Sequence, residues 1–210
     1  MSLFSRHYLL RGHLPHATLS PIPITGVPLR EPRWCAAKAK YAQLPKKLRS
    51  WLLARDSLTS KLVKAAEGDF RVELLSQKVA RVYASEAHLL GLKNNRQALV
   101  REVILYGKQQ PWVFARSVMP LTTLTGRLRA LRKLDNRPMG HHLFSYPYMR
   151  RSAIEIASIG AAQDYLPKSL RPLTAAIQSP LWGRRSVFHL DNKPLLVSEV
   201  FLGTFRPGHT

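Results

Sequence analysis

The sequence contains a single cysteine, Cys35, no long hydrophobic segment and few acidic residues. One cysteine excludes an intramolecular disulfide framework and a zinc site built from several cysteines. No run approaches the about 18 apolar residues of a membrane-spanning helix, so we expect no membrane span. There is also no Gly-x-Ser-x-Gly elbow and no glycine-rich phosphate loop, so the usual signatures of serine hydrolases and nucleotide-binding enzymes are missing. The pairs His13/His16 and His141/His142 lack further ligands at metal-binding spacing, and we predict no metal site.

Acidic residues are scarce relative to basic ones. The 210 residues include 33 Lys and Arg against 12 Asp and Glu, which gives a formal charge of +21. Such a surplus is typical of nucleic-acid-binding proteins, which neutralise phosphates. It also suits an enzyme that attracts a small polyanion into a cleft. Hydrophobic residues make up 45%, so the chain can bury a core, but composition does not choose between the two partners.

The first 30 residues contain no carboxylate, since Glu31 is the first acidic residue. This stretch is basic and rich in proline, and it has no uninterrupted apolar segment of the kind a secretory signal needs. We therefore predict a basic, proline-rich N-terminal extension over residues 1–32, followed by one folded domain over 33–210.

The periodicity of the domain predicts an α+β fold with an antiparallel sheet. Leu44, Leu48 and Leu52 recur every four residues, and Asp56-Ser57 is a good N-cap for a second helix. A basic amphipathic helix fits residues 124–134. About six strands, mostly in hairpins, are expected at 70–74 continuing through 79–83, 98–106, 112–119, parts of 142–148 and 153–156, 185–190 and 195–204.

Three charged residues lie among apolar neighbours on these strands. Arg101 alternates with aliphatic residues, Arg116 with aromatic and aliphatic ones, and Glu199 stands in an apolar row of the last strand. A buried charge is costly unless it is paired or binds something, so these three side chains could line an anion-binding pocket. The alternatives are that these faces point outward, or that Arg101 and Glu199 form a structural ion pair.

A series of short motifs, in order along the chain, makes the sequence recognisable. They are Trp51-Leu52-Leu53, Asp56-Ser57-Leu58-Thr59, Arg101-Glu102-Val103, Pro111-Trp112, Ala115-Arg116-Ser117-Val118, Pro120, Thr123-Leu124-Thr125-Gly126, Pro138-Met139-Gly140, Leu143-Phe144, residues 181–186, Lys193-Pro194-Leu195-Leu196, Glu199 and Phe201-Leu202. Over roughly residues 33–204 the chain resembles the chorismate lyase family. These bacterial enzymes convert chorismate to 4-hydroxybenzoate and pyruvate at the start of ubiquinone biosynthesis.

The resemblance implies a six-stranded antiparallel sheet with a ligand enclosed beneath helical flaps, and no metal or organic cofactor. It implies that Arg101 holds the ring carboxylate and that Glu199 meets the hydroxyl at the other end of the ring. Backbone groups at Leu58 and Met139 would line the site. We expect Arg116 to lie nearby and to stabilise negative charge on the enolpyruvyl side, so Glu199, Arg101 and Arg116 are the predicted catalytic residues.

The segment 158–180 is longer than usual for that family, and its prolines predict a surface excursion or an altered flap instead of extra sheet. We expect a cytoplasmic monomer that acts on chorismate, needs no nucleic acid and has at most a peripheral contact with the membrane. Two alternatives stay open at this point. One is a non-catalytic domain of the same fold that senses a small anion, and the other is a basic nucleic-acid-binding protein.

Overall fold

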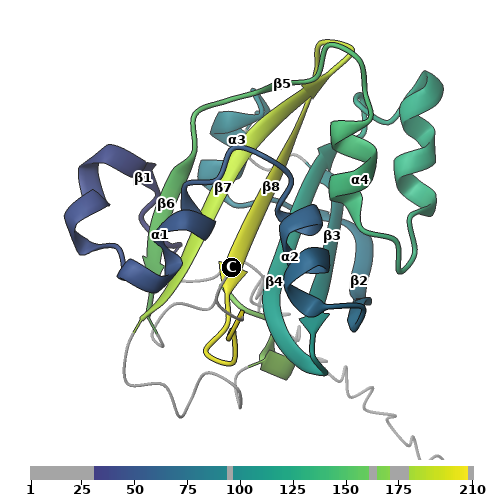
Figure 1. Cartoon of the computed structure of the whole chain (residues 1–210). Coiled ribbons are helices and arrows are strands. Elements are labelled where there is room, and N and C mark those ends of the chain that lie inside the picture. Colours follow the sequence, from purple (N-terminus) through teal and green to yellow (C-terminus); the bar gives the residue numbers. More distant parts are fainter. Residues whose placement is uncertain (1–30, 94–96, 161–164, 171–179, 208–210) are drawn as a thin grey trace, which may run out of the picture.

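The computed structural model describes residues 31–93, 97–160, 165–170 and 180–207, and a single antiparallel sheet runs through them (Figure 1). Its strands are β1 (Cys35–Ala36), β2 (Phe70–Arg81), β3 (Gln97–Gly107), β4 (Gln110–Pro120), β5 (Arg150–Arg151), β6 (Glu155–Ile159), β7 (Leu181–Leu190) and β8 (Lys193–Phe201). The order across the sheet is β1-β6-β7-β8-β4-β3-β2, and β5 pairs with β7. The six longer strands correspond to the about six that the sequence predicts, and the α+β class is confirmed.

Two tight hairpins build the centre of the sheet. The β3–β4 turn holds Lys108 and Gln109 at φ 49° and 61°, and the β7–β8 turn holds Asp191 and Asn192 at φ 50° and 60°. Positive φ at both central residues gives a turn whose twist matches that of the flanking strands. Both hairpins were predicted, although β7 begins at Leu181, before the start of the strand expected at 185–190.

The helical segments are η1 (Ala37–Gln43), α1 (Lys46–Leu52), α2 (Leu58–Ala66), α3 (Ala84–Leu89), η2 (Gly126–Lys133), α4 (Met139–Phe144) and η3 (Lys168–Leu170). The predicted cap of α2 is confirmed, because the Ser57 hydroxyl accepts the Ser60 N–H at 3.2 Å. The helix expected at 124–134 is the 3-10 helix η2, with Leu128 and Leu131 buried as its pattern requires. No helix in the described ranges is long and apolar enough to cross a membrane.

The strand predicted within residues 142–148 is wrong, because the helix α4 occupies the start of that segment. Pro138 fixes a backbone angle suited to the position before a helix, and Met139 and Leu143 are then four residues apart on one buried face. The short apolar run could belong to either a strand or a helix by periodicity alone, and packing onto α2 decides for the helix.

The sheet separates two apolar layers. Its front face carries Val103 and Leu105 and is covered by α1, α2 and α4 (Figure 1). Its back face carries Ile104 and Phe114. The described part of the predicted 158–180 excursion belongs to the back layer, where Tyr165, Leu166 and Leu170 are buried.

The excursion therefore differs from its prediction in two respects. Residues 158 and 159 belong to β6 and so extend the sheet, and residues 165–170 pack on the back face, away from the helices that cover the front. Residues 161–164 and 171–179 lie outside the described residues, as does the N-terminal extension up to residue 30.

Candidate active site

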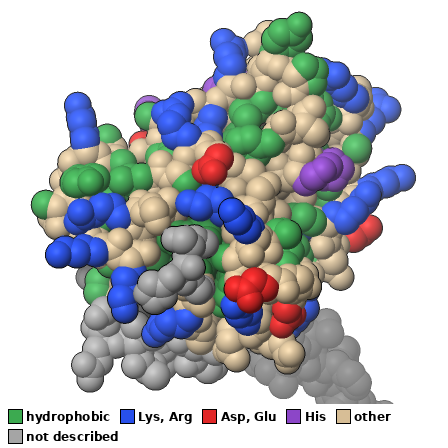
Figure 2. Space-filling model, viewed as in Figure 1, with side chains coloured by type: hydrophobic (Ala, Val, Ile, Leu, Met, Phe, Trp, Pro, Cys, Tyr) green, Lys and Arg blue, Asp and Glu red, His purple; other side chains and the backbone are tan. Residues whose placement is uncertain are grey.

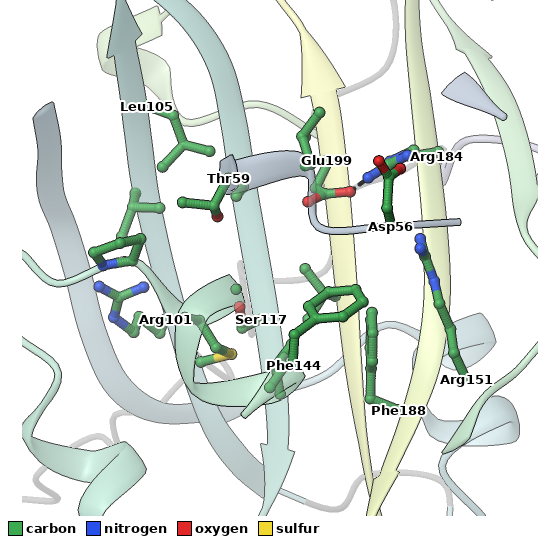
Figure 3. A pocket seen from close by; sticks show the side chains of 18 residues that line it. Asp56, Thr59, Arg101, Leu105, Ser117, Phe144, Arg151, Arg184, Phe188 and Glu199 are labelled. Carbon is green, nitrogen blue, oxygen red and sulfur yellow. Dashed lines mark hydrogen bonds and ion pairs between the residues drawn. The ribbon is translucent and has the colours of Figure 1, made fainter. Parts of the chain in front are cut away.

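A pocket of about 520 Å³, its open mouth included, lies between the front face of the sheet and the helices α2 and α4. Strands β3, β4, β7 and β8 form its floor, and Leu58, Thr59 and Met139 are among the residues of its helical cover. Figure 3 shows Arg101 at one end of the pocket and Glu199, Arg184 and Arg151 gathered at the other.

The close approach of α4 to α2 depends on a glycine. A Cβ atom on Gly140 would lie 2.4 Å from the Thr59 Oγ1 atom and 3.3 Å from the Ser57 Oγ atom. Any side chain at this position would push the two helices apart. Gly140 thus lets α2 and α4 together form the cover of the pocket.

Arg101 is a buried cation without a counterion. Its side chain points from β3 into the pocket with the residue only 1% exposed, and its Nη2 donates to the carbonyl oxygens of Asp135 (2.7 Å) and Arg137 (3.0 Å). Its Nε is buried without a hydrogen-bond partner. Across the described ranges no carboxylate lies within ion-pairing distance of it, and burial lowers its pKa to about 10. An incoming anion would supply the missing counterion.

Glu199 lies on β8 and is held by an arginine of the neighbouring strand. Arg184 Nε donates to Glu199 Oε2 at 2.6 Å, while Arg184 Nη1 donates to the carbonyl oxygens of Trp51 and Ala54, both at 2.8 Å. The Arg184 side chain is 1% exposed and that of Glu199 15%. Arg184 is therefore fixed by the chain around the end of α1, and it orients the Glu199 carboxylate along the pocket wall.

A third arginine reaches the same end of the pocket from β5. Arg151 Nη1 donates to the carbonyl oxygen of Arg55 at 2.9 Å, and its guanidinium lies 5.0 Å from the centre of the Phe188 ring. Its Nε is buried without a partner. Burial, and then the positive charge of Arg184, lower the pKa of Arg151 to about 10.

Arg116 does not face the pocket, so that part of the site prediction is wrong. Arg101 pairs with Ser117 across the β3–β4 ladder, and Ala115 pairs with Glu199 across β4–β8. Directly opposed residues share a face of the sheet, so Ser117 and Ala115 point to the front and Arg116 to the back.

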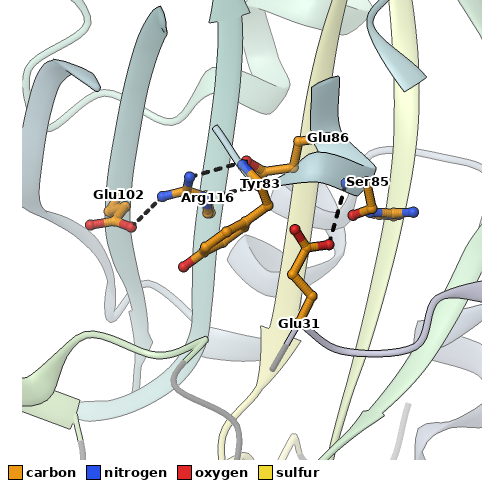
Figure 4. A network of polar contacts seen from close by, with 7 residues as sticks. Glu31, Tyr83, Ser85, Glu86, Glu102 and Arg116 are labelled. Carbon is orange, nitrogen blue, oxygen red and sulfur yellow. Dashed lines mark hydrogen bonds and ion pairs between the residues drawn. The ribbon is translucent and has the colours of Figure 1, made fainter. Parts of the chain in front are cut away.

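On the back face Arg116 belongs to a buried ion-pair network (Figure 4). It donates to Glu86 Oε1 and to Glu102 Oε1, both at 2.8 Å, and its guanidinium lies 4.6 Å from the centre of the Tyr83 ring. Burial alone would lower the pKa of Arg116, but the bonds to Glu86 outweigh burial and raise it. Arg116 is therefore fully engaged within the protein.

The predicted residues Arg101, Glu199, Leu58 and Met139 all line the pocket, whereas sequence reasoning missed Arg151 and Arg184. One signal pointed to Arg184: strand alternation from Glu199 through the β7–β8 hairpin places the two opposite each other. Nothing comparable identifies Arg151, which lies on a two-residue strand. No group of three or more His, Cys, Asp or Glu in the described ranges could hold a metal ion.

The arrangement suits a rigid anion with a polar group at its far end. Two strand spacings and two residues of register separate Arg101 from Glu199, which places their Cα atoms about 12 Å apart. The side chains shorten that span, and the apolar Val103, Ala115 and Val197 lie between the two ends. A planar carboxylate-bearing ring with a hydroxyl opposite would bridge Arg101 and Glu199.

Comparisons with known proteins agree on one family. The sequence model of the chorismate lyase family matches residues 31–206. A protein of Methylococcus capsulatus named "Probable chorismate pyruvate-lyase" is 42% identical over 158 residues, 74% of this chain and 94% of that protein. One of the same name from Thiobacillus denitrificans is 41% identical over 160 residues, 76% of this chain and 84% of that protein.

Among solved structures, the effector domain of PhnF from Mycobacterium smegmatis is similar with a TM-score of 0.50 and 16% sequence identity. The likeness covers 72% of this chain and 91% of that one. At this identity it supports the fold alone.

Proposed function

The chain belongs to the chorismate lyase family, and on that premise we propose that it removes pyruvate from chorismate to leave 4-hydroxybenzoate, as a step toward ubiquinone. The observation that carries the proposal is Arg101, a buried cation with no counterion among the described residues, at one end of a pocket whose other end holds Glu199. A site of this form needs an anion on one side and a hydrogen-bond donor on the other.

In the proposed complex the ring carboxylate of chorismate binds Arg101, which lines the pocket and has a buried Nε without a hydrogen-bond partner among the described residues. The contact is a charge-assisted hydrogen bond in a dry environment, which is the strong kind. The ring hydroxyl donates to the Glu199 carboxylate, which Arg184 holds in place. Leu58 and Met139 close the ring in from the helical side.

The reaction breaks the bond between ring carbon C3 and the ether oxygen, and removes the hydrogen at C4. The ether oxygen becomes the ketone oxygen of pyruvate, and the methylene of the enolpyruvyl group gains one hydrogen to become its methyl group. The ring becomes aromatic and keeps its hydroxyl. Because aromatisation supplies much of the driving force, the protein has chiefly to bind, orient and polarise the substrate.

Glu199 could act in this step in two ways. It could take the C4 hydrogen as a base, or it could only accept the bond from the hydroxyl while that hydrogen passes directly to the methylene. Its short contact with Arg184 favours the second role, because the guanidinium already occupies one of the two carboxylate oxygens.

The test is incubation of the purified full chain with chorismate, with separate detection of 4-hydroxybenzoate and pyruvate in equal amounts. A sample without protein gives the background. Absence of both products above that background would overturn the proposal and favour a non-catalytic anion-sensing domain. In Glu199→Gln we expect a reduced kcat, and a near-normal rate would eliminate Glu199 as an essential base.

Three finer features belong to the same proposal. We propose that the enzyme acts as a monomer, because the sheet floor and the helical cover of α2 and α4 already bound the pocket within one copy. Lys and Arg are spread over the face shown in Figure 2 without forming one block, which suits steering of a dianion better than docking on a nucleic acid. We place the enzyme in the cytoplasm, where this spread charge would also permit contact with an anionic membrane surface.

A further inference from the structure

The pocket contains three arginines, and among the residues that the structure describes only Arg184 has an ion-pair partner. Arg184 pairs with Glu199, whereas neither Arg101 nor Arg151 has a carboxylate within ion-pairing distance in the parts of the chain that the structure describes. Both of these arginines also have a buried Nε atom without a hydrogen-bond partner. Neither guanidinium is ion-paired, although Glu199 and Asp56 act electrostatically on Arg151 from a greater distance, and a cation at each end of one pocket suits a ligand with two negative charges.

Arg151 is better placed than Arg184 to receive the second charge. The Nε of Arg184 is engaged by Glu199, and its Nη1 by two backbone carbonyls. Arg151 is held through Nη1 and by its packing on Phe188, which leaves the Nε side of its guanidinium uncommitted. In Figure 3 its guanidinium points toward the end of the pocket where Glu199 and Arg184 lie.

The positions of the functional groups on chorismate fit this layout. The ring hydroxyl at C4 and the enolpyruvyl ether at C3 are on adjacent carbons, and the ring carboxylate at C1 is on the far side. When the C1 carboxylate is on Arg101 and the hydroxyl on Glu199, the enolpyruvyl carboxylate falls beside Glu199. At that end Arg151 is the cation whose Nε is buried without a hydrogen-bond partner among the described residues.

We propose that Arg151 is the second carboxylate anchor of the site and binds the enolpyruvyl carboxylate of the substrate. This inference rests on the proposed function. Since 4-hydroxybenzoate has only the ring carboxylate, Arg151 holds the substrate and the departing pyruvate but not the aromatic product. Arg151 is thereby the residue by which the pocket distinguishes a dianionic substrate from its monoanionic product.

The inference also assigns to Arg151 the role that was predicted for Arg116. A cation near the enolpyruvyl group stabilises the charge that builds up on the ether oxygen and its carboxylate as the C3–O bond breaks. Arg116 lies on the back face and is paired with Glu86, so it is not available for that task. Arg151 reaches the enolpyruvyl side from β5, a strand at the rim of the pocket.

The experiment compares two ligands in matched variants of the full chain. Arg151→Met keeps the apolar stem against Phe188 and removes the charge, and Arg151→Lys keeps the charge but not the planar fork. Arg150→Met is the control, because Arg150 is the adjacent residue of β5, is exposed, and donates to Asn192 at 2.7 Å. For each variant kcat and KM are measured with chorismate, and the Kd of 4-hydroxybenzoate is measured by titration.

We expect Arg151→Met to lower kcat/KM for chorismate by about 10- to 100-fold, while the Kd of 4-hydroxybenzoate stays within about twofold of wild type. The kcat/KM of Arg151→Lys should lie between the values of Arg151→Met and wild type. The kcat/KM of Arg150→Met should match that of wild type. Equal losses for both ligands in Arg151→Met would show a structural role and overturn the inference. A kcat/KM within about threefold of wild type would overturn it as well.

The same measurements keep this inference separate from the proposed function. If wild type forms no product, the proposed function fails. The anchoring role of Arg151 is then tested by titration. It is supported if Arg151→Met weakens binding of chorismate without weakening that of 4-hydroxybenzoate, and it is refuted otherwise. If wild type is active and Arg151→Met is unaffected, only the anchor fails.

Discussion

The back-face network of Arg116 allows a prediction whose size follows from the structure. Glu86 and Glu102 each contact the Arg116 guanidinium at 2.8 Å, but the Glu86 side chain is 1% exposed and that of Glu102 is 20% exposed. Changing either glutamate to glutamine removes one negative charge and keeps the volume. Only at the buried position is the cation left without solvent to replace the lost partner.

Glu86→Gln should therefore lower the free energy of unfolding by about 3 kcal/mol, the lower end of the cost of breaking a buried pair, because the amide oxygen still accepts one bond. At about 2–4 °C per kcal/mol for a chain of this size, Tm falls by about 6–12 °C. Glu102→Gln should cost less than about 1 kcal/mol. The assay is urea denaturation together with thermal unfolding followed by circular dichroism.

A double variant tests the reasoning directly. Arg116→Met combined with Glu86→Gln removes the buried cation together with its partner, so the double variant should be more stable than Glu86→Gln alone. It should also keep the KM for chorismate within about threefold, because Arg116 points away from the pocket. Equal losses in Glu86→Gln and Glu102→Gln would refute the electrostatic argument. A large rise in KM in the double variant would refute the placement of Arg116.

Three further predictions concern the pocket and its cover. Gly140→Ala places a Cβ 2.4 Å from Thr59 Oγ1 and should cost about 1–3 kcal/mol in urea denaturation, and Thr59→Ala in the same chain should recover part of that loss. A rescue that fails completely would place the strain elsewhere. In wild type, 4-hydroxybenzoate at about 100 times its Kd should raise the unfolding free energy by about 2.7 kcal/mol, or Tm by about 5–11 °C. At the same concentration Arg101→Met should abolish that shift, and an unchanged shift would contradict the anchoring role of Arg101.

Much of the local structure could be predicted from the sequence because its causes are local. The alternation in β3 and β4, the cap at Ser57 and the turn residues between β7 and β8 depend on neighbours a few positions away. The helix α4 shows the limit, since a short apolar run fits either periodicity and its contacts with α2 are decided by tertiary packing.

The residues of the candidate site likewise fall into those that the sequence identifies and those that only the tertiary structure reveals. Arg101 and Glu199 were identified as charges in apolar rows of strands, and both line the pocket. Arg116 fits the same pattern but lies on the other face, within a network completed by Glu86 from α3. No sequence pattern identifies Arg151 as a pocket residue, because its position there depends on the pairing of β5 with β7.

By itself the sequence determined that this chain forms an antiparallel sheet with two tight hairpins, and that charges on its strands must be paired or bind an anion. Only the tertiary structure decided which of those charges meet. Alternation along one strand follows from the geometry of its own backbone, but the face it turns to the pocket depends on its register with strands far away in the chain. That register places Arg101 opposite Ser117, and therefore Arg116 on the back of the sheet.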